Sequence, residues 1–135
     1  MGTTEPVADG ATASIRLRLS PTDARYAGGL AAGSTAMAIF ADLETELSLL
    51  EGGDEGLCAG YESVEFLAPL RVGDFVEATG RVVARGRSSR KCTVELYKVL
   101  SVDDDGVLVK QDGPVLAARA TVTIVVGKTI AERFG

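Results

Sequence analysis

Residues 34–50 carry apolar side chains at three- and four-residue steps, the spacing of one face of an α-helix. The positions in this apolar stripe are Ala36, Ile39, Phe40, Leu43, Leu47 and Leu50. Ser34 is placed to cap the start of the helix, and Gly52 and Gly53 are placed to end it. The pattern therefore predicts a single long amphipathic helix.

The segments on either side of this helix alternate apolar and polar residues between turn signals, as half-buried strands do. One strand is expected before the helix, at residues 14–20, followed by a glycine-punctuated loop at residues 21–33. Further strands are expected at residues 57–67, 75–85, 91–100 and 115–126. We therefore expect an α+β fold, in which a curved antiparallel sheet of about five strands wraps one long central helix.

The chain is expected to form one domain, residues 14–135, preceded by a flexible N-terminal arm, residues 1–13, of small and polar residues. A sheet of this size with a single helix leaves one edge and part of its concave face exposed in a monomer. Natural proteins usually cover such edges. A homodimer or a higher homo-oligomer is therefore expected.

The charge and the apolar runs exclude several kinds of partner. Nineteen acidic against 14 basic residues give a net charge of −5, which disfavours nucleic acid because phosphate binding needs a basic face. The longest apolar run of the helical region, residues 36–41, is too short to span a bilayer, and residues 1–14 lack the pattern of an export signal. We expect a cytoplasmic protein without a membrane partner.

The residues available for chemistry are limited. Cys58 and Cys92 have neither the spacing nor the histidine companions of a zinc site, so no metal is expected and both are expected in the core. The chain contains no histidine, which excludes nucleophile systems that pair serine or cysteine with histidine within it. Any acid–base chemistry must therefore use carboxylates, tyrosines or lysines.

Several short motifs, in this order and spacing, resemble the hotdog superfamily. They are Phe66-Leu67-Ala68-Pro69, Gly73-Asp74, Gly80-Arg81-Val82 and Gly86-Arg87-Ser88-Ser89. A closer resemblance, over residues 15–125, is to the branch that contains β-alanyl-CoA and 3-aminobutyryl-CoA ammonia-lyases. It is carried by motifs such as residues 23–28, 45–47, 61–62, 64–66, 73–75 and 118–120.

The resemblance implies a lyase that eliminates ammonia from a short-chain β-aminoacyl-CoA, foremost 3-aminobutyryl-CoA, or adds it to an enoyl-CoA. Coenzyme A is then part of the substrate, and no other cofactor is expected. The alternative is an acyl-CoA thioesterase of the same fold. Such thioesterases often carry an acid on the central helix at a place that, counted from Gly28, Phe40 occupies here, two residues before Asp42. A third interpretation is a non-catalytic sensor that binds acyl-CoA.

Asp42 and Glu46 are the first candidates for catalysis. They lie four residues apart and therefore share one face of the helix, with Glu46 about 20° from Ile39 at the margin of the apolar stripe. Glu44 falls on the far side of the stripe. We assign Glu46 as the base for the α-proton and Asp42 as the partner of the substrate ammonium, although the two roles are interchangeable on the sequence alone. The alternative is a pair of solvated carboxylates.

Further candidates surround this pair. Tyr61 and Tyr26 are polar-tipped aromatics, either of which could donate to the substrate, and Gly28 and Gly33 would let the backbone approach the thioester. Glu65 is either a third carboxylate of the site or, as we prefer, a buried partner for Arg119.

Basic residues concentrate around one predicted hairpin. They are Arg85, Arg87, Arg90 and Lys91. This cluster is a candidate for binding the phosphates of coenzyme A, since guanidinium and ammonium groups suit phosphate oxygens. A solubilising hairpin tip is the alternative.

Overall fold

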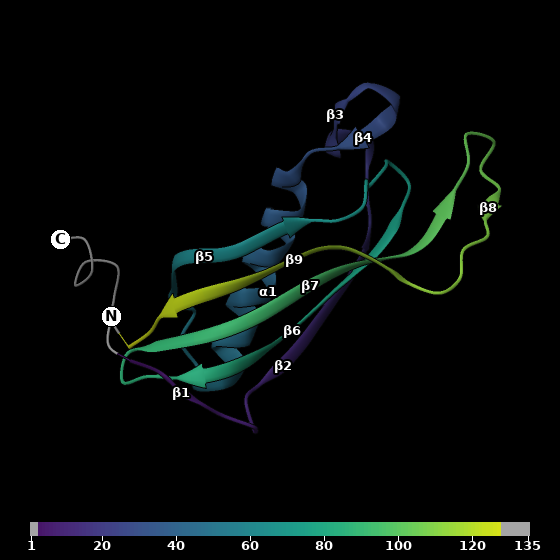
Figure 1. Ribbon diagram of the computed structural model, residues 1–135. Coiled ribbons are helices and arrows are strands. Elements are labelled where there is room, and N and C mark those ends of the chain that lie inside the picture. The colour runs from purple at the N-terminus through teal and green to yellow at the C-terminus, as the bar shows by residue number, and fades with distance from the viewer. Residues whose placement is uncertain (1–2, 128–135) are drawn as a thin grey trace.

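The computed structural model describes residues 3–127. A single long helix, α1 (Gly33–Gly52), lies across the concave face of a curved antiparallel sheet (Figure 1). The long strands are β2 (Thr12–Arg18), β5 (Leu57–Phe66), β6 (Phe75–Arg85), β7 (Ser89–Val102) and β9 (Val115–Val125). The shorter elements are β1 (Glu5–Pro6), η1 (Pro21–Asp23), β3 (Ala24–Tyr26), η2 (Ala27–Gly29), β4 (Leu30–Ala31) and β8 (Leu108–Val109). The predicted α+β arrangement is confirmed.

The order of the strands makes β5 an edge of the sheet. The order is β1-β6-β7-β9-β5, with β2 also paired to β6 and β8 paired to β7. β5 is antiparallel to β9, and its register is interrupted between Cys58 and Gly60 and again between Glu62 and Glu65. Because of the first interruption, Cys58 and Tyr61 lie opposite buried residues of β9 and face the helix.

The core forms where the apolar face of α1 meets the inner face of the sheet. Phe40, Leu43 and Leu47 are fully buried there. Burial of side chains of this size contributes about 1.5–3 kcal/mol each relative to exposure. The helix ends as predicted, since Gly53 takes a left-handed φ of 77° and donates its N–H to the carbonyl of Leu49. The predicted cap at Ser34 is wrong, because the helix begins at Gly33, Ala32 is the N-cap and no side chain caps the helix.

The buried face of α1 is wider than the predicted stripe on one side, and it ends before the last turn of the helix. Leu50, expected in the core, is 59% exposed, whereas Glu44 and Ser48 are buried. The sheet covers an arc that runs from Ile39 through Phe40 to Ser48, because β5 closes over that side of the helix. Periodicity shows that an apolar face exists, but the strand packed on the helix decides where the face ends.

The N-terminal segment, expected to be a flexible arm, is instead packed against the sheet over much of its length. β1 pairs with the end of β6, and Val7 donates its N–H to the carbonyl of Val83 at 2.9 Å. Ala11 donates its backbone N–H to Glu51 at the end of the helix, at 2.8 Å. The residues before β2 pack there because β2 leaves part of the β6 edge unpaired.

The two cysteines have different surroundings. Cys92 is buried in the core as predicted, but Cys58, also expected there, is exposed on the edge strand β5. Within residues 3–127, no group of three or more acidic, cysteine or histidine side chains is arranged to hold a metal ion. None of the helices in that range has the length and apolar character needed to cross a membrane.

Candidate active site

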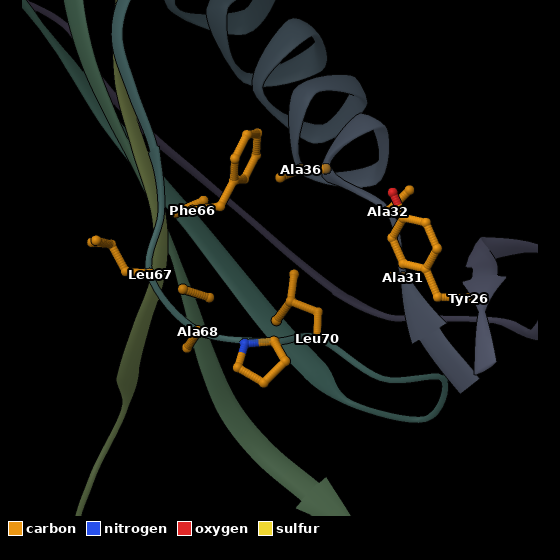
Figure 2. A pocket seen from close by; sticks show the side chains of 12 residues that line it. Tyr26, Ala31, Ala32, Ala36, Phe66, Leu67, Ala68 and Leu70 are labelled. Carbon is orange, nitrogen blue, oxygen red and sulfur yellow. The ribbon is translucent and has the colours of Figure 1, made fainter. Parts of the chain in front are cut away.

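An apolar pocket of about 590 Å³ opens beside the start of α1 (Figure 2). Volumes of this size are usual for small-molecule sites. Its walls are Tyr26, Ala31, Ala32, Gly33, Ala36, the segment 66–70, Ala117 and Ala118. The ring of Phe66 points from the end of β5 toward the first turn of the helix. Two of the predicted substrate-binding residues, Tyr26 and Gly33, therefore line one pocket.

Contacts between two loops hold this pocket in shape. Ala31 donates its N–H to the carbonyl of Leu70, and Val72 donates to the carbonyl of Gly29, each at 2.8 Å. The Arg71 guanidinium donates to the carbonyl of Gly28 at 3.0 Å. Gly28 has a φ of 75°, a conformation that glycine adopts without strain. Gly28 therefore shapes the loop behind the pocket and is not part of its lining.

Gly33 allows the closest approach in the pocket. A Cβ at this position would lie 2.9 Å from a ring carbon of Phe66, so the helix start and the end of β5 meet only because no side chain separates them. The backbone N–H groups of the first helical turn have no side-chain cap. Such groups carry partial positive charge and suit a developing oxyanion.

A second cluster of polar groups lies further along the helix, between α1 and β5. Glu44 is 6% exposed, and its carboxylate accepts a hydrogen bond of 2.7 Å from the hydroxyl of Tyr61. Cys58 also donates to this carboxylate. The candidate Tyr61 is thus brought together with Glu44, and not with Asp42 or Glu46.

Burial controls the electrostatics of this cluster. Loss of solvent raises the pKa of the Glu44 carboxyl, and the hydrogen bonds from Tyr61 and Cys58 reverse only part of the rise. The pKa values of the Cys58 thiol and the Tyr61 hydroxyl are also raised, by burial and by the neighbouring Glu44. Glu44 is therefore the member of the cluster whose pKa is shifted toward neutral pH, whereas the pKa values of the thiol and the hydroxyl are shifted away from it.

Asp42 and Glu46, assigned from sequence as the catalytic pair, are both exposed on the protomer and neither lines the pocket. They lie on the face of α1 turned away from the sheet. Their roles remain predictions.

Glu65 pairs with Arg119 as preferred from the sequence, with 3.0 Å between the carboxylate and the guanidinium Nε. The expected burial of this pair is wrong, because both side chains are about half exposed. The alternation along β5 shifts at the interruption between Glu62 and Glu65, and Glu65 lies opposite the exposed Arg119. It therefore does not line the pocket beside the helix start.

The basic cluster is only partly available for an anion. Arg85 is paired with Glu51 and Asp9, and Lys91 lies 3.0 Å from Glu62. Burial alone would raise the pKa of Glu51, but the hydrogen bond and charge of Arg85 outweigh it, so that this pKa is lowered.

The other two members of the basic cluster lie beside the end of α1. Arg87 and Arg90 line a hollow of about 220 Å³ there, together with Glu51 and Asp54. Arg90 also donates to the carbonyls of Gly86 and Ser89, at 2.8 Å each. The helix has 20 residues, so this hollow is about 25 Å from the pocket of the same protomer.

Comparison with known proteins settles the family. The sequence model of the thioesterase superfamily matches residues 28–99. The 3-aminobutyryl-CoA ammonia lyase of Acetoanaerobium sticklandii is 38% identical over 118 residues, which are 84% of this chain and 93% of the relative. The chain belongs to the thioesterase superfamily.

Solved structures place this member of the superfamily in the hotdog fold. The β-alanyl-CoA:ammonia lyase of Clostridium propionicum matches with a TM-score of 0.82 and 34% identity, over 87% of this chain and 85% of that one. A hexameric hotdog fold thioesterase of Campylobacter jejuni matches with a TM-score of 0.72 and 19% identity, over 84% of this chain and 81% of that one. The second likeness shows the shared fold alone.

The residue that sequence reasoning missed is Glu44. On the helical wheel Glu44 lies about 40° beyond Phe40, at the margin of the apolar stripe opposite Glu46, and no feature of the pattern marks that margin as covered. Glu44 follows Phe40 by one turn, and Phe40 is fully buried. That spacing was a usable signal, but only the packing of β5 shows that this side of the helix is covered.

Proposed function

We propose that this protein eliminates ammonia from a short-chain β-aminoacyl-CoA and, in reverse, adds ammonia to the enoyl-CoA. The observation that carries the proposal is the 38% identity to a 3-aminobutyryl-CoA ammonia lyase over 84% of this chain and 93% of the relative. The structural likeness to a β-alanyl-CoA:ammonia lyase supports the same reaction. A substrate with a three- or four-carbon acyl group, 3-aminobutyryl-CoA foremost, fits both relatives.

The pocket beside the helix start suits the acyl end of such a substrate. Its lining is apolar, and the uncapped N–H groups of the first turn of α1 lie next to it. Loss of the α-proton places negative charge on the thioester oxygen, and N–H groups at a helix start stabilise such charge. The β-carbon and its amine would then lie among the small side chains of the pocket.

We also propose that the chain works as a homodimer or higher homo-oligomer. β5 ends the sheet with Cys58 and Phe66 exposed along it, an edge that natural proteins usually cover. The Campylobacter jejuni relative by fold is a hexamer. In such an assembly, Arg87 and Arg90 of one copy could hold the coenzyme A phosphates of a substrate bound in another copy. The cytoplasmic location stays a prediction.

The reaction is tested by mixing crotonyl-CoA or acryloyl-CoA with ammonia and following the absorbance of the enoyl thioester. We expect the absorbance to fall only when both enzyme and ammonia are present. Butyryl-CoA without ammonia serves as the control for the thioesterase alternative, with free thiol as the readout. Release of thiol from butyryl-CoA with no ammonia-dependent loss of the enoyl group would favour the thioesterase and contradict the proposal.

Valine in place of Gly33 should weaken the binding of butyryl-CoA by about tenfold or more, because overpacking of this kind costs about 1–3 kcal/mol. The added side chain would collide with Phe66 and fill the mouth of the pocket. Isothermal titration measures the effect. The matched control is Gly52→Val at the other end of the helix, where an added Cβ meets no atom within 4 Å. Equal affinities of the two variants for butyryl-CoA would show that butyryl-CoA does not bind in this pocket.

A further inference from the structure

We propose that Glu44 is the base that removes the α-proton and that Tyr61 is the positioning residue that holds its carboxylate. This inference rests on the proposed lyase reaction and names the group that performs its central step. It replaces the assignment of Glu46 and Asp42 made from the sequence.

Glu44 and Tyr61 meet between the helix and the edge of the sheet. Glu44 comes from the middle of α1 and Tyr61 from the edge strand β5, and their 2.7 Å hydrogen bond joins the two elements. The tyrosine faces inward because the register of β5 shifts between Cys58 and Gly60. Cys58, on the same inner face, is exposed, and Tyr61 is half buried. The carboxylate therefore lies one side chain below the surface, beside the free edge of the sheet.

The buried carboxylate of Glu44 lacks a cationic partner among the described residues. No lysine or arginine among residues 3–127 forms an ion pair with Glu44, so its charge is compensated only by neutral donors. Burying a carboxylate without a cation destabilises the fold. If this contact only held the helix against the strand, a neutral side chain would do so with a smaller loss of stability. Groups kept at such a cost are concentrated at functional sites.

The surroundings of the carboxylate are uncharged near neutral pH. The titratable groups that face it are Tyr61 and Cys58 on β5 and Cys92 on β7. All three are neutral near neutral pH, because burial raises the pKa of each, that of Cys92 to about 12. Glu44 is thus surrounded by groups that do not change charge in this range. A carboxylate with a raised pKa is also the stronger base.

The position of β5 explains how Glu44 can reach a substrate. Within one protomer, Glu44 lies about 12 Å along the helix from Ala36, which lines the pocket. If two β5 edges pair antiparallel about Glu62, near the middle of the strand, Phe66 of one copy lies opposite Cys58 of the other. Phe66 is a wall of the pocket, and Cys58 lies over Glu44. The Glu44 carboxylate of one copy would then lie beside the pocket of the neighbouring copy and could reach a substrate bound there.

The proposed step is balanced in atoms and electrons. The α-proton passes to a carboxylate oxygen of Glu44, and the electron pair of the broken C–H bond forms the double bond between the α- and β-carbons. The C–N bond breaks with its electron pair on nitrogen, so that the β-ammonium leaves as neutral ammonia. Glu44 then returns its proton to solvent.

The first test is Glu44→Gln, which keeps an acceptor for the Tyr61 hydroxyl. We expect kcat for the addition of ammonia to crotonyl-CoA to fall by about a hundredfold or more, with butyryl-CoA binding within about threefold of the unmodified protein. Glu95→Gln is the matched control, because Glu95 accepts a 3.0 Å hydrogen bond from Tyr97 elsewhere on the sheet. If Glu46→Gln loses turnover while Glu44→Gln keeps it, the proposal is overturned.

The second test is the pH profile of Tyr61→Phe. The Tyr61 hydrogen bond lowers the pKa of Glu44, so its removal should raise that pKa further. The base must be deprotonated to act, and the acid limb of kcat should therefore move to higher pH. Tyr97→Phe should leave the limb in place. If the acid limb of Tyr61→Phe does not move, the proposal is overturned. This pH profile tests the proposal even if Glu44→Gln fails to fold.

The two proposals fail in different ways. If the unmodified protein does not consume crotonyl-CoA or acryloyl-CoA with ammonia, the lyase reaction fails and the role of Glu44 fails with it. If the unmodified protein is active, and both Glu44→Gln and Tyr61→Phe keep rates within about threefold, the reaction stands and only the role of Glu44 is overturned.

Discussion

Asp74→Ala is expected to lower the free energy of unfolding by about 3–5 kcal/mol, the range for a buried charge that loses its partner. Asp74 is almost fully buried, and its carboxylate accepts hydrogen bonds from the Ser101 hydroxyl at 2.6 Å and the Arg71 N–H at 2.9 Å. The ammonium of Lys98, itself only 15% exposed, lies 3.4 Å away. Alanine leaves all three groups without this partner. Urea denaturation measures the loss.

The same substitution should also weaken butyryl-CoA binding, because Asp74 closes the turn that carries Arg71 and Val72 against the loop behind the pocket. Asp103→Ala is the matched control. Asp103 also accepts backbone N–H bonds in a turn, from Asp105 and Val107, but it is exposed. A surface change of this kind is expected to cost less than about 1 kcal/mol. Equal losses in the two variants would contradict the role given to the buried carboxylate.

Leu43→Ala is expected to destabilise the protein by about 2–5 kcal/mol. Leu43 has no exposed surface and lies in the core between α1 and the sheet. Truncation removes buried apolar surface and leaves a cavity that the surrounding strands can fill only in part. A domain of this size is stabilised by about 5–15 kcal/mol in total, so the loss is a large share of it. Thermal and urea unfolding both measure it.

Leu50→Ala is the control on the same helix and with the same side chain. Leu50 is 59% exposed, so its truncation is expected to change stability by less than about 0.5 kcal/mol in the isolated protomer. A loss as large as that of Leu43→Ala would mean that Leu50 is buried in the assembled protein.

Much of the fold follows from local pattern. The apolar spacing of residues 34–50 and the alternation in residues 75–85 predict the helix and a strand because each has a period that only one kind of element satisfies. Gly53 ends the helix as expected because a left-handed residue is needed there. The N-terminal residues 5–13 carry no such period. Their pairing with β6 depends on an edge that exists only in the folded sheet.

The site was predictable in part. Tyr26 and Gly33 line one pocket, since the glycine-rich loop and the helix start are joined directly in sequence. The choice among the helix acids was not predictable in the same way. Asp42 and Glu46 are carboxylic acids like Glu44 and lie within two residues of it on the same helix. Their burial differs only because β5 packs against one side of the helix, and β5 lies beyond the turn at Gly53.

The sequence by itself determined the types of the long elements, because periods and turn residues are local properties that need no partner. Its motifs, in their order and spacing, carried the resemblance to the family. Only the tertiary structure decided which acid is desolvated and which tyrosine donates a hydrogen bond to that acid. A carboxyl pKa rises through desolvation, and desolvation depends on all the chain that surrounds the group. The strand that covers Glu44, and so raises its pKa, begins more than ten residues later in the chain.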